Sequence, residues 1–324
     1  MKKILQLLIF VFALTITSKA QQLVVYNQHL IDPFSINPAF AGMDEKGHIN
    51  MCFRKQWLGF SNSPTSYYLS GYSRLGEKTP QPYDQHSLRI SRPQQYESLF
   101  KTKSKSFYHA IGGYIQSDKL GPFTRLSPGL TYSPHFKISK KYTLGIGILA
   151  GLLNYTFNDE GLLLASPDDQ TYLDFLAQNT SSSFMNLNAG MVLYSEKMEL
   201  HYAAQQLLRN QIWFVNNASV LDLQLHHFLG FAYRFTTHQK NMVFKPSFTL
   251  RYVQDLPLSF DLSILADFED KFWAAMSYRY NNAVVTMVGM NFNQFRFGYA
   301  FDYNSSALRK TNAGSHEIFM GMNF

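Results

Sequence analysis

Residues 295–303 read Phe295-Arg296-Phe297-Gly298-Tyr299-Ala300-Phe301-Asp302-Tyr303, with an aromatic side chain at every second position. Successive side chains of a β-strand point to opposite faces, so one face of this strand is aromatic and the other carries Arg296 and Asp302. The same alternation recurs over residues 244–252, 260–268 and 316–324. The sequence therefore predicts an all-β fold.

The solvent that meets the apolar face decides between a soluble sandwich and a membrane barrel. One hairpin of this kind suits a sandwich, but nearly the whole chain alternates in this way. A transmembrane barrel turns its apolar side chains toward lipid and its polar ones toward the lumen, in segments of about ten residues. The chain ends on Phe324, with Ile318, Met320 and Met322 on the same face, and this ending resembles the C-terminal signal of bacterial outer-membrane barrels.

Composition agrees with membrane strands. Aromatic and charged residues each make up 16% of the chain, and the mean hydropathy is −0.18, so apolar residues are dispersed. Beyond the N-terminus no apolar run is long enough for a spanning helix. We predict an antiparallel transmembrane barrel of about 14 strands, an even number as single-chain bacterial barrels require. The expected strands start near His48, Thr65, Phe107, Arg125, Tyr142, Phe184, Glu199, Leu225, Met242, Leu258, Lys271, Ala283, Phe295 and His316.

The N-terminus predicts a secretory signal peptide over residues 1–20. Lys2 and Lys3 precede an apolar run that ends before Ser18-Lys19-Ala20, and this is the layout of a cleaved leader. Loss of Lys2, Lys3 and Lys19 lowers the formal charge from +7 to +4. A nucleic-acid partner is not expected. Cys52 is the single cysteine, which excludes an internal disulfide.

Residues 21–46 form a separate N-terminal arm before the barrel, which spans residues 47–324. Alternation is absent from the arm, and Asp32-Pro33 and Asn37-Pro38 argue against both helix and central strand. The arm is therefore extended or rich in turns and must lie against something.

The arm also opens a resemblance to a known family. In the first part of the chain the motifs that carry this resemblance are residues 26–28, residues 32–42, which run from Asp32 to Gly42 and contain Asn37-Pro38-Ala39-Phe40, and residues 54–60 and 63–65. Further motifs follow in the same order at residues 117–122, 244–248, 257–261, 270–273 and 314–318. They resemble the PorP/SprF family of outer-membrane proteins of the type IX secretion and gliding machinery of Bacteroidetes-type bacteria. The resemblance runs from about Tyr26 to the last residue.

The resemblance implies a non-enzymatic barrel that supports the export or surface attachment of a partner protein. The implied partners are type IX secretion components, a secreted adhesin or its C-terminal domain, and outer-membrane lipid. The alternative function is a diffusion porin for small solutes. No residue identifies the secreted client.

Both termini are expected in the periplasm, which makes the even-numbered connections periplasmic and short. One of these periplasmic connections is long: residues 76–106 form a basic loop with a net charge of +3. The family resemblance implies a shorter connection at this place. Residues 76–106 are either a solvated loop or a docking surface for a periplasmic partner or an anionic polymer. Residues 157–183 form an acidic outer loop without Lys or Arg, a candidate calcium or basic-partner site without EF-hand spacing.

The candidate site residues fall into two groups. Partner contacts are expected from Tyr26, Asp32, Phe34, Asn37, Phe40, Trp57, Arg89, Arg92, Lys101, Lys103 and Lys105. Lumen charges are expected at Arg125, Lys245, Arg251, Asp261, Asp267, Arg279, Arg296, Asp302 and Glu317, because Arg or Lys facing lipid would cost about 2–4 kcal/mol. Trp57 is alternatively an interface anchor.

A barrel of this size encloses more space than its own side chains fill, so water or a plug must occupy it. We expect the arm to plug the lumen at least in part, anchored by Tyr26, Phe34 and Phe40; the alternative is docking under the periplasmic rim.

Catalytic and metal sites are not expected. The sequence has no Gly-x-Ser-x-Gly elbow. Adjacent His226 and His227 face opposite sides of a strand, as do His316 and Glu317. We therefore predict no enzyme, no cofactor and no metal ligands.

Overall fold

The computed structural model describes residues 26–44, 46–60, 62–76, 106–158, 181–215, 218–237, 242–304 and 312–324. Three short 3-10 turns come first, η1 (Asn27–Leu30), η2 (Pro33–Ser35) and η3 (Pro38–Phe40), and strands make up most of the other described residues. No helix in these ranges has the length and apolar character needed to cross a membrane.

The strands succeed one another up and down along the chain. Their bounds are β1 (His48–Lys55), β2 (Thr65–Leu75), β3 (Phe107–Leu120), β4 (Phe123–Lys137), β5 (Thr143–Phe157), β6 (Ser181–Tyr194), β7 (Met198–Gln205), β8 (Gln211–Val215), β9 (Ala218–Asp222), β10 (His226–Tyr233), β11 (Phe235–Thr237), β12 (Met242–Val253), β13 (Ser259–Phe268), β14 (Phe272–Arg279), β15 (Ala283–Phe292), β16 (Phe295–Asn304) and β17 (Ser315–Asn323).

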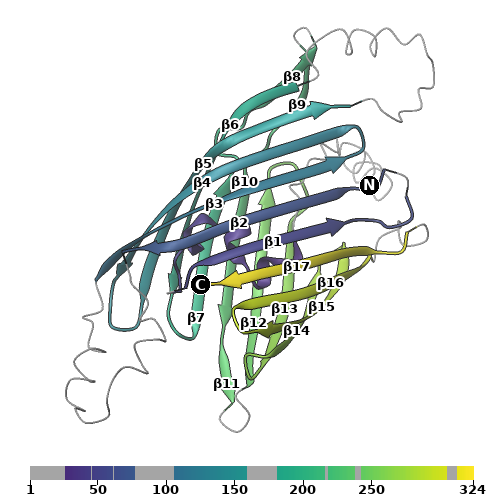
Figure 1. The fold of residues 1–324 in the computed structure, drawn as a ribbon. Helices are drawn as coiled ribbons and strands as arrows, with labels where there is room; N and C mark the ends of the chain where they lie inside the picture. Colours follow the sequence, from purple (N-terminus) through teal and green to yellow (C-terminus); the bar gives the residue numbers. More distant parts are fainter. Residues whose placement is uncertain are drawn as a thin grey trace, which may run out of the picture.

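The sheet closes on itself (Figure 1). Neighbouring strands pair antiparallel, β1 pairs with β17, and β10 pairs with β12. Because β11 continues β10 past Arg234 on the same partner β12, the result is a closed 14-stranded antiparallel barrel. The predicted fold class and strand number are confirmed. The separate hairpin of β8 and β9 was not predicted.

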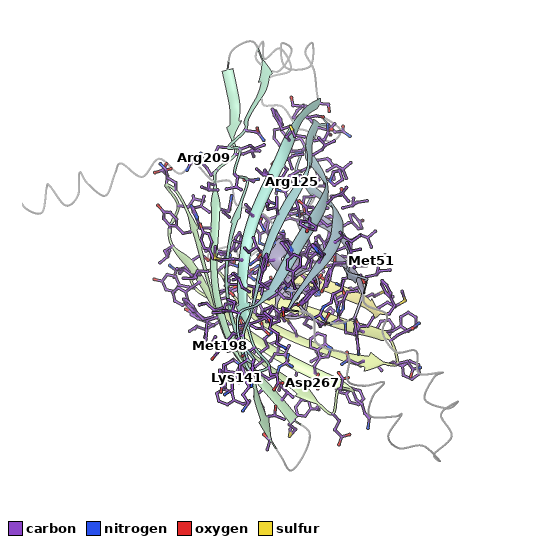
Figure 2. All side chains as sticks on the ribbon, turned by 90° about the vertical axis from the view of Figure 1, so that its left-hand side faces the viewer. Met51, Arg125, Lys141, Met198, Arg209 and Asp267 are labelled. Carbon is purple, nitrogen blue, oxygen red and sulfur yellow. The ribbon has the colours of Figure 1, made fainter. Side chains whose placement is uncertain are left out.

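The alternation places apolar side chains outside and polar ones inside. On β16, Tyr299 is 42% exposed on the outer surface of the chain, while Asp302 on the other face is 2% exposed. Met51 is 54% exposed and lies on the outside of the barrel (Figure 2). The outer wall is the surface that the bilayer covers, and the inner wall is polar.

The barrel has two rims, which we name from the C-terminus. At the C-terminal rim, Gly47 and Phe324 exchange two backbone hydrogen bonds of 2.9 Å. The turns β4–β5, β6–β7, β13–β14 and β15–β16 lie at this rim, as do Gly76 and Ser106, which flank residues 77–105. The opposite rim carries β1–β2, β3–β4 and the flanks of residues 159–180. Most of both predicted long loops, including Arg89, Arg92, Lys101, Lys103 and Lys105, lies outside the described residues.

Candidate functional site: the arm inside the barrel

Residues 26–44, the main described part of the N-terminal arm, occupy the lumen. Figure 1 shows its purple helical turns enclosed by the strands. Tyr26, Phe34 and Phe40, the three expected anchors, are only 3–4% exposed. The position of the arm is that of a plug inside the lumen and not that of a segment docked under the periplasmic rim.

Two Asx-Pro steps give the arm its turns. Pro33 and Pro38 begin η2 and η3, where the fixed φ of proline suits a first helical residue and its missing N–H is not needed. Asn37 caps η3, because its side-chain oxygen accepts a hydrogen bond of 2.9 Å from the Ala39 N–H. Turns this short show no periodicity in the sequence.

The η3 turn sits on glycines of the barrel wall. A Cβ atom at Gly147 would lie 2.2 Å from Ala39 N, and one at Gly190 would lie 2.0 Å from Asn37 Oδ1. Any side chain at either position would occupy the space of the arm. The amide of Asn37 donates hydrogen bonds of 3.2 Å to the carbonyl oxygens of Met191 and Tyr202. The wall is therefore shaped for this turn.

Apolar packing supplements these polar contacts. Phe34, Ala39, Phe40 and Ala41 form one buried cluster with wall residues Ala110 and Val192. Phe40 meets the His201 ring edge-on at a centroid distance of 5.1 Å. A small pocket of about 30 Å³ beside Phe40 and Lys245 has room for about one water molecule.

The first described residues of the arm are held by carboxylates. Glu317 accepts hydrogen bonds from the backbone N–H groups of Asn27 (3.0 Å) and Gln28 (2.9 Å). The Asn27 side-chain amide donates to Asp302 and accepts from Arg279 (3.1 Å). Tyr26 donates its hydroxyl to Asp118 (3.2 Å). The start of η1 is therefore bound to three different parts of the wall.

Ion pairs line the lumen around the arm. Arg54 bridges Asp302 (2.5 Å) and Glu317 (2.9 Å), and Asp261 accepts from Arg251 (2.7 Å) and Arg279 (3.3 Å). Further pairs join Arg125 to Asp118, and Lys245 to Glu199 at 2.8 Å. Removing one partner of a buried pair leaves an uncompensated charge, which costs about 3–5 kcal/mol. These pairs fix the wall against which the arm docks.

Two titratable groups of the arm respond to burial. Burial lowers the pKa of His29 to about 4, against the opposing effect of Asp261, so His29 is neutral at neutral pH and the ionic partners of Asp261 are the two arginines. Burial also raises the pKa of Asp32. Asp32 accepts hydrogen bonds of 3.2 Å from Ser70 and Tyr72, which keep this enclosed carboxyl satisfied.

The arm runs along the length of the barrel. Tyr26 and Asn27 contact residues near the opposite rim, such as Asp118 and Glu317, whereas Ala41 meets His135 near the C-terminal rim. The barrel itself begins and ends at the C-terminal rim, where β1 and β17 pair. Because the described start of the chain lies in the other half of the lumen, the periplasmic placement of both termini stays a prediction.

The expected lumen charges all lie on the inner face. Arg125, Arg251, Asp261, Arg279, Asp302 and Glu317 are buried, and Lys245, Asp267 and Arg296 are partly exposed inside the rims. Arg296 donates to Asn50 (3.0 Å), and Asp267 accepts from the Asp270 N–H (2.9 Å). Sequence reasoning missed Arg54, Asp118 and Glu199 as partners. The signal for Arg54 was its alternation with His48, Asn50 and Cys52 on the inner face of β1.

The expected partner contacts divide into two described groups. Tyr26, Asp32, Phe34, Asn37 and Phe40 are buried against the wall, so a second protein reaches them only if the arm leaves. Trp57 lies half-buried in the β1–β2 connection, where its backbone N–H donates to the Ser315 hydroxyl at 3.3 Å.

The described residues contain no cluster of three or more His, Cys, Asp or Glu that could hold a metal ion. The acidic residues 159–180, for which the sequence left calcium binding open, lie outside the described ranges. His226 is buried on the inner face and His227 is not, as their adjacency predicts.

A closed barrel with a lipid-facing apolar wall and a polar, occupied lumen defines an outer-membrane β-barrel protein. Residues 18–322 match the family model described as type IX secretion system membrane protein PorP/SprF. The chain belongs to this family, and the resemblance carried by its motifs is confirmed. No curated protein matches the sequence significantly.

Solved structures share the architecture at very low identity. The monoaromatic hydrocarbon channel CymD aligns over 92% of both chains at 9% identity and a TM-score of 0.51. The toluene transporter TbuX of Ralstonia pickettii is 9% identical over 89% of this chain and 91% of its own, with a TM-score of 0.48. Omp33 of Acinetobacter baumannii is 5% identical over 87% of this chain and 100% of its own, with a TM-score of 0.47. These likenesses concern the fold alone.

Proposed function

We propose that this protein is a non-enzymatic outer-membrane component of the type IX secretion and gliding machinery, which supports export or cell-surface attachment of a secreted protein or adhesin. Membership of the PorP/SprF family supports the assignment to the secretion system. The observation that carries the mechanism is the docked arm, which joins the two halves of the lumen through Glu317 at one end and Gly147 at the other.

In this mechanism the barrel is a rigid membrane platform. The buried ion pairs and the arm brace the wall from inside, so the two rims keep a fixed geometry relative to each other. We propose that the C-terminal rim faces the periplasm, because short turns gather there as on the periplasmic side of known barrels. Periplasmic subunits would then contact that rim, and the C-terminal domain of the secreted partner would contact the opposite one.

Deletion of the whole chain tests the function. We expect one or a few surface or secreted proteins to disappear from the cell surface and culture fluid, while porin-dependent uptake of small solutes is unchanged. Quantitative proteomics of both fractions, with the wild-type gene restored in trans as the control, measures this. An exoproteome and cell surface identical to wild type would rule out the secretion role.

A diffusion porin is the competing function. The arm argues against it, because three aromatic anchors and the carboxylate-bound η1 turn occupy the lumen of the intact protein. Single-channel conductance of the wild-type protein separates the two functions, since a porin conducts and a plugged barrel does not.

A further inference from the structure

Two turns at the C-terminal rim share one construction. In the β4–β5 turn the Ser139 hydroxyl accepts hydrogen bonds from the N–H groups of Lys141 (3.2 Å) and Tyr142 (3.1 Å). In the β6–β7 turn the Ser195 hydroxyl accepts from Lys197 (3.4 Å) and Met198 (3.0 Å). A serine that closes the turn in this way fixes the backbone that carries the lysines.

The turns lie next to each other. Strands β5 and β6 pair from Thr143–Tyr194 onward, so the two turns are separated by roughly 10 Å, two strand spacings. Lys140, Lys141 and Lys197 are all exposed, and the described residues place no carboxylate within ion-pair distance of them. Figure 2 labels Lys141 and Met198 at the same end of the barrel.

The two turns are basic in sum. Glu196 is also exposed in the β6–β7 turn, so three lysines against one glutamate leave a net charge of +2. The backbone of Lys137 donates to the carbonyl of Ser106 (2.8 Å), where the basic segment 77–105 rejoins the barrel. Lys137 itself is exposed at the end of β4, beside the β4–β5 turn.

The β13–β14 turn at the same rim has the opposite charge. Glu269 and Asp270 are exposed there, and Lys271 pairs with Glu269 at 3.0 Å. Two carboxylates against one lysine leave this turn with a net charge of −1. The rim is therefore polarised, basic over β4–β7 and acidic over β13–β14.

We propose that Lys140, Lys141 and Lys197 form a docking surface for a carboxylate-rich segment of a periplasmic protein. Ammonium groups carried on rigid turns attract such a segment and orient it, because the β13–β14 side of the rim repels it. A protein segment is favoured over lipid headgroups because Lys140, Lys141 and Lys197 belong to the turns and not to the strands that face the bilayer. The inference rests on the proposed periplasmic orientation of this rim.

The test uses the full-length protein in nanodiscs with a fluorescein-labelled oligoglutamate peptide, followed by anisotropy. Substitution of the three lysines (K140Q, K141Q, K197Q) is expected to weaken binding about tenfold, and binding of the wild type should fall as salt rises to about 0.15 M. Lys119→Gln, which removes an exposed lysine at the opposite rim, should change neither. Equal binding by the triple variant and wild type would overturn the proposal.

Two further variants and probes distinguish this surface from the basic loop and from a lipid site. If neutralising Arg89, Arg92, Lys101, Lys103 and Lys105 alone abolishes binding, the loop and not the turns is the docking surface. If the triple variant loses association with phosphatidylglycerol vesicles but keeps the peptide, the surface binds lipid and the proposal is wrong. If a cysteine introduced by Lys140→Cys can be labelled from the cell exterior, the C-terminal rim does not face the periplasm and the proposed orientation is wrong. The secretion role is tested separately by the phenotype of the deletion.

Discussion

Replacing Gly147 with valine is expected to expel the η3 turn and open the lumen. The new side chain would begin 2.2 Å from the backbone nitrogen of Ala39, which cannot retreat because Asn37 and Phe40 fix the turn on both sides. Losing the burial of Phe40 and the two hydrogen bonds of Asn37 to the wall removes on the order of 4 kcal/mol, which lowers the docked-to-free ratio about a thousandfold. Planar-bilayer recordings should show conducting steps for the variant and a closed wild-type protein.

Gly71→Val is the matched control for this prediction. Gly71 lies on the outer face, and the nearest atom to a Cβ there is 3.6 Å away, an ordinary contact. The control should insert and stay closed. Wild-type recordings that already show the large conductance of the Gly147 variant would instead favour the porin function.

Asp261→Asn is expected to have the largest effect on stability. Asp261 is fully buried and accepts from Arg251 and Arg279, so the variant leaves the enclosed Arg251 guanidinium without a carboxylate and Arg279 with only its 3.9 Å contact to Asp302. Loss of a buried partner lowers the free energy of unfolding by about 3–5 kcal/mol. Urea unfolding in lipid vesicles measures the change from the midpoint and slope.

Glu269→Gln removes a carboxylate from the exposed pair with Lys271 and serves as the control. An exposed pair contributes less than about 1 kcal/mol, so the midpoint should hardly move. If both variants shifted the midpoint equally, the buried pairs would not brace the barrel as proposed.

The strands could be predicted because their evidence is local. Alternation with a period of two is visible in any short window, and every expected strand start lies within three residues of the observed one, the largest offset being Phe184 against Ser181. The inward direction of charges follows from the same alternation, since lipid excludes them from the outer face. The same alternation therefore predicts both the position of each strand and which of its side chains face the lumen.

The pairing of the lumen charges could not be predicted, because it depends on closure. Arg54 forms an ion pair with Glu317 only because the first barrel strand, β1, pairs with the last, β17. The contact site of η3 on the wall could not be predicted either. Gly147 and Gly190 are inner-wall positions, and their role is visible only in the structure, where the arm lies on them. The β8–β9 hairpin was missed because two short strands off the barrel add no alternation to the main pattern.

Cys52 provides the most direct test of whether the arm fills a polar lumen. It is the only cysteine in the chain, it is 1% exposed, and it packs under Tyr26 and Tyr68 on the inner wall. A charged maleimide should leave Cys52 unmodified in the native outer membrane and modify it once residues 21–46 are deleted. Rapid modification of Cys52 in the wild-type protein, at the rate seen without the arm, would contradict the plugged barrel.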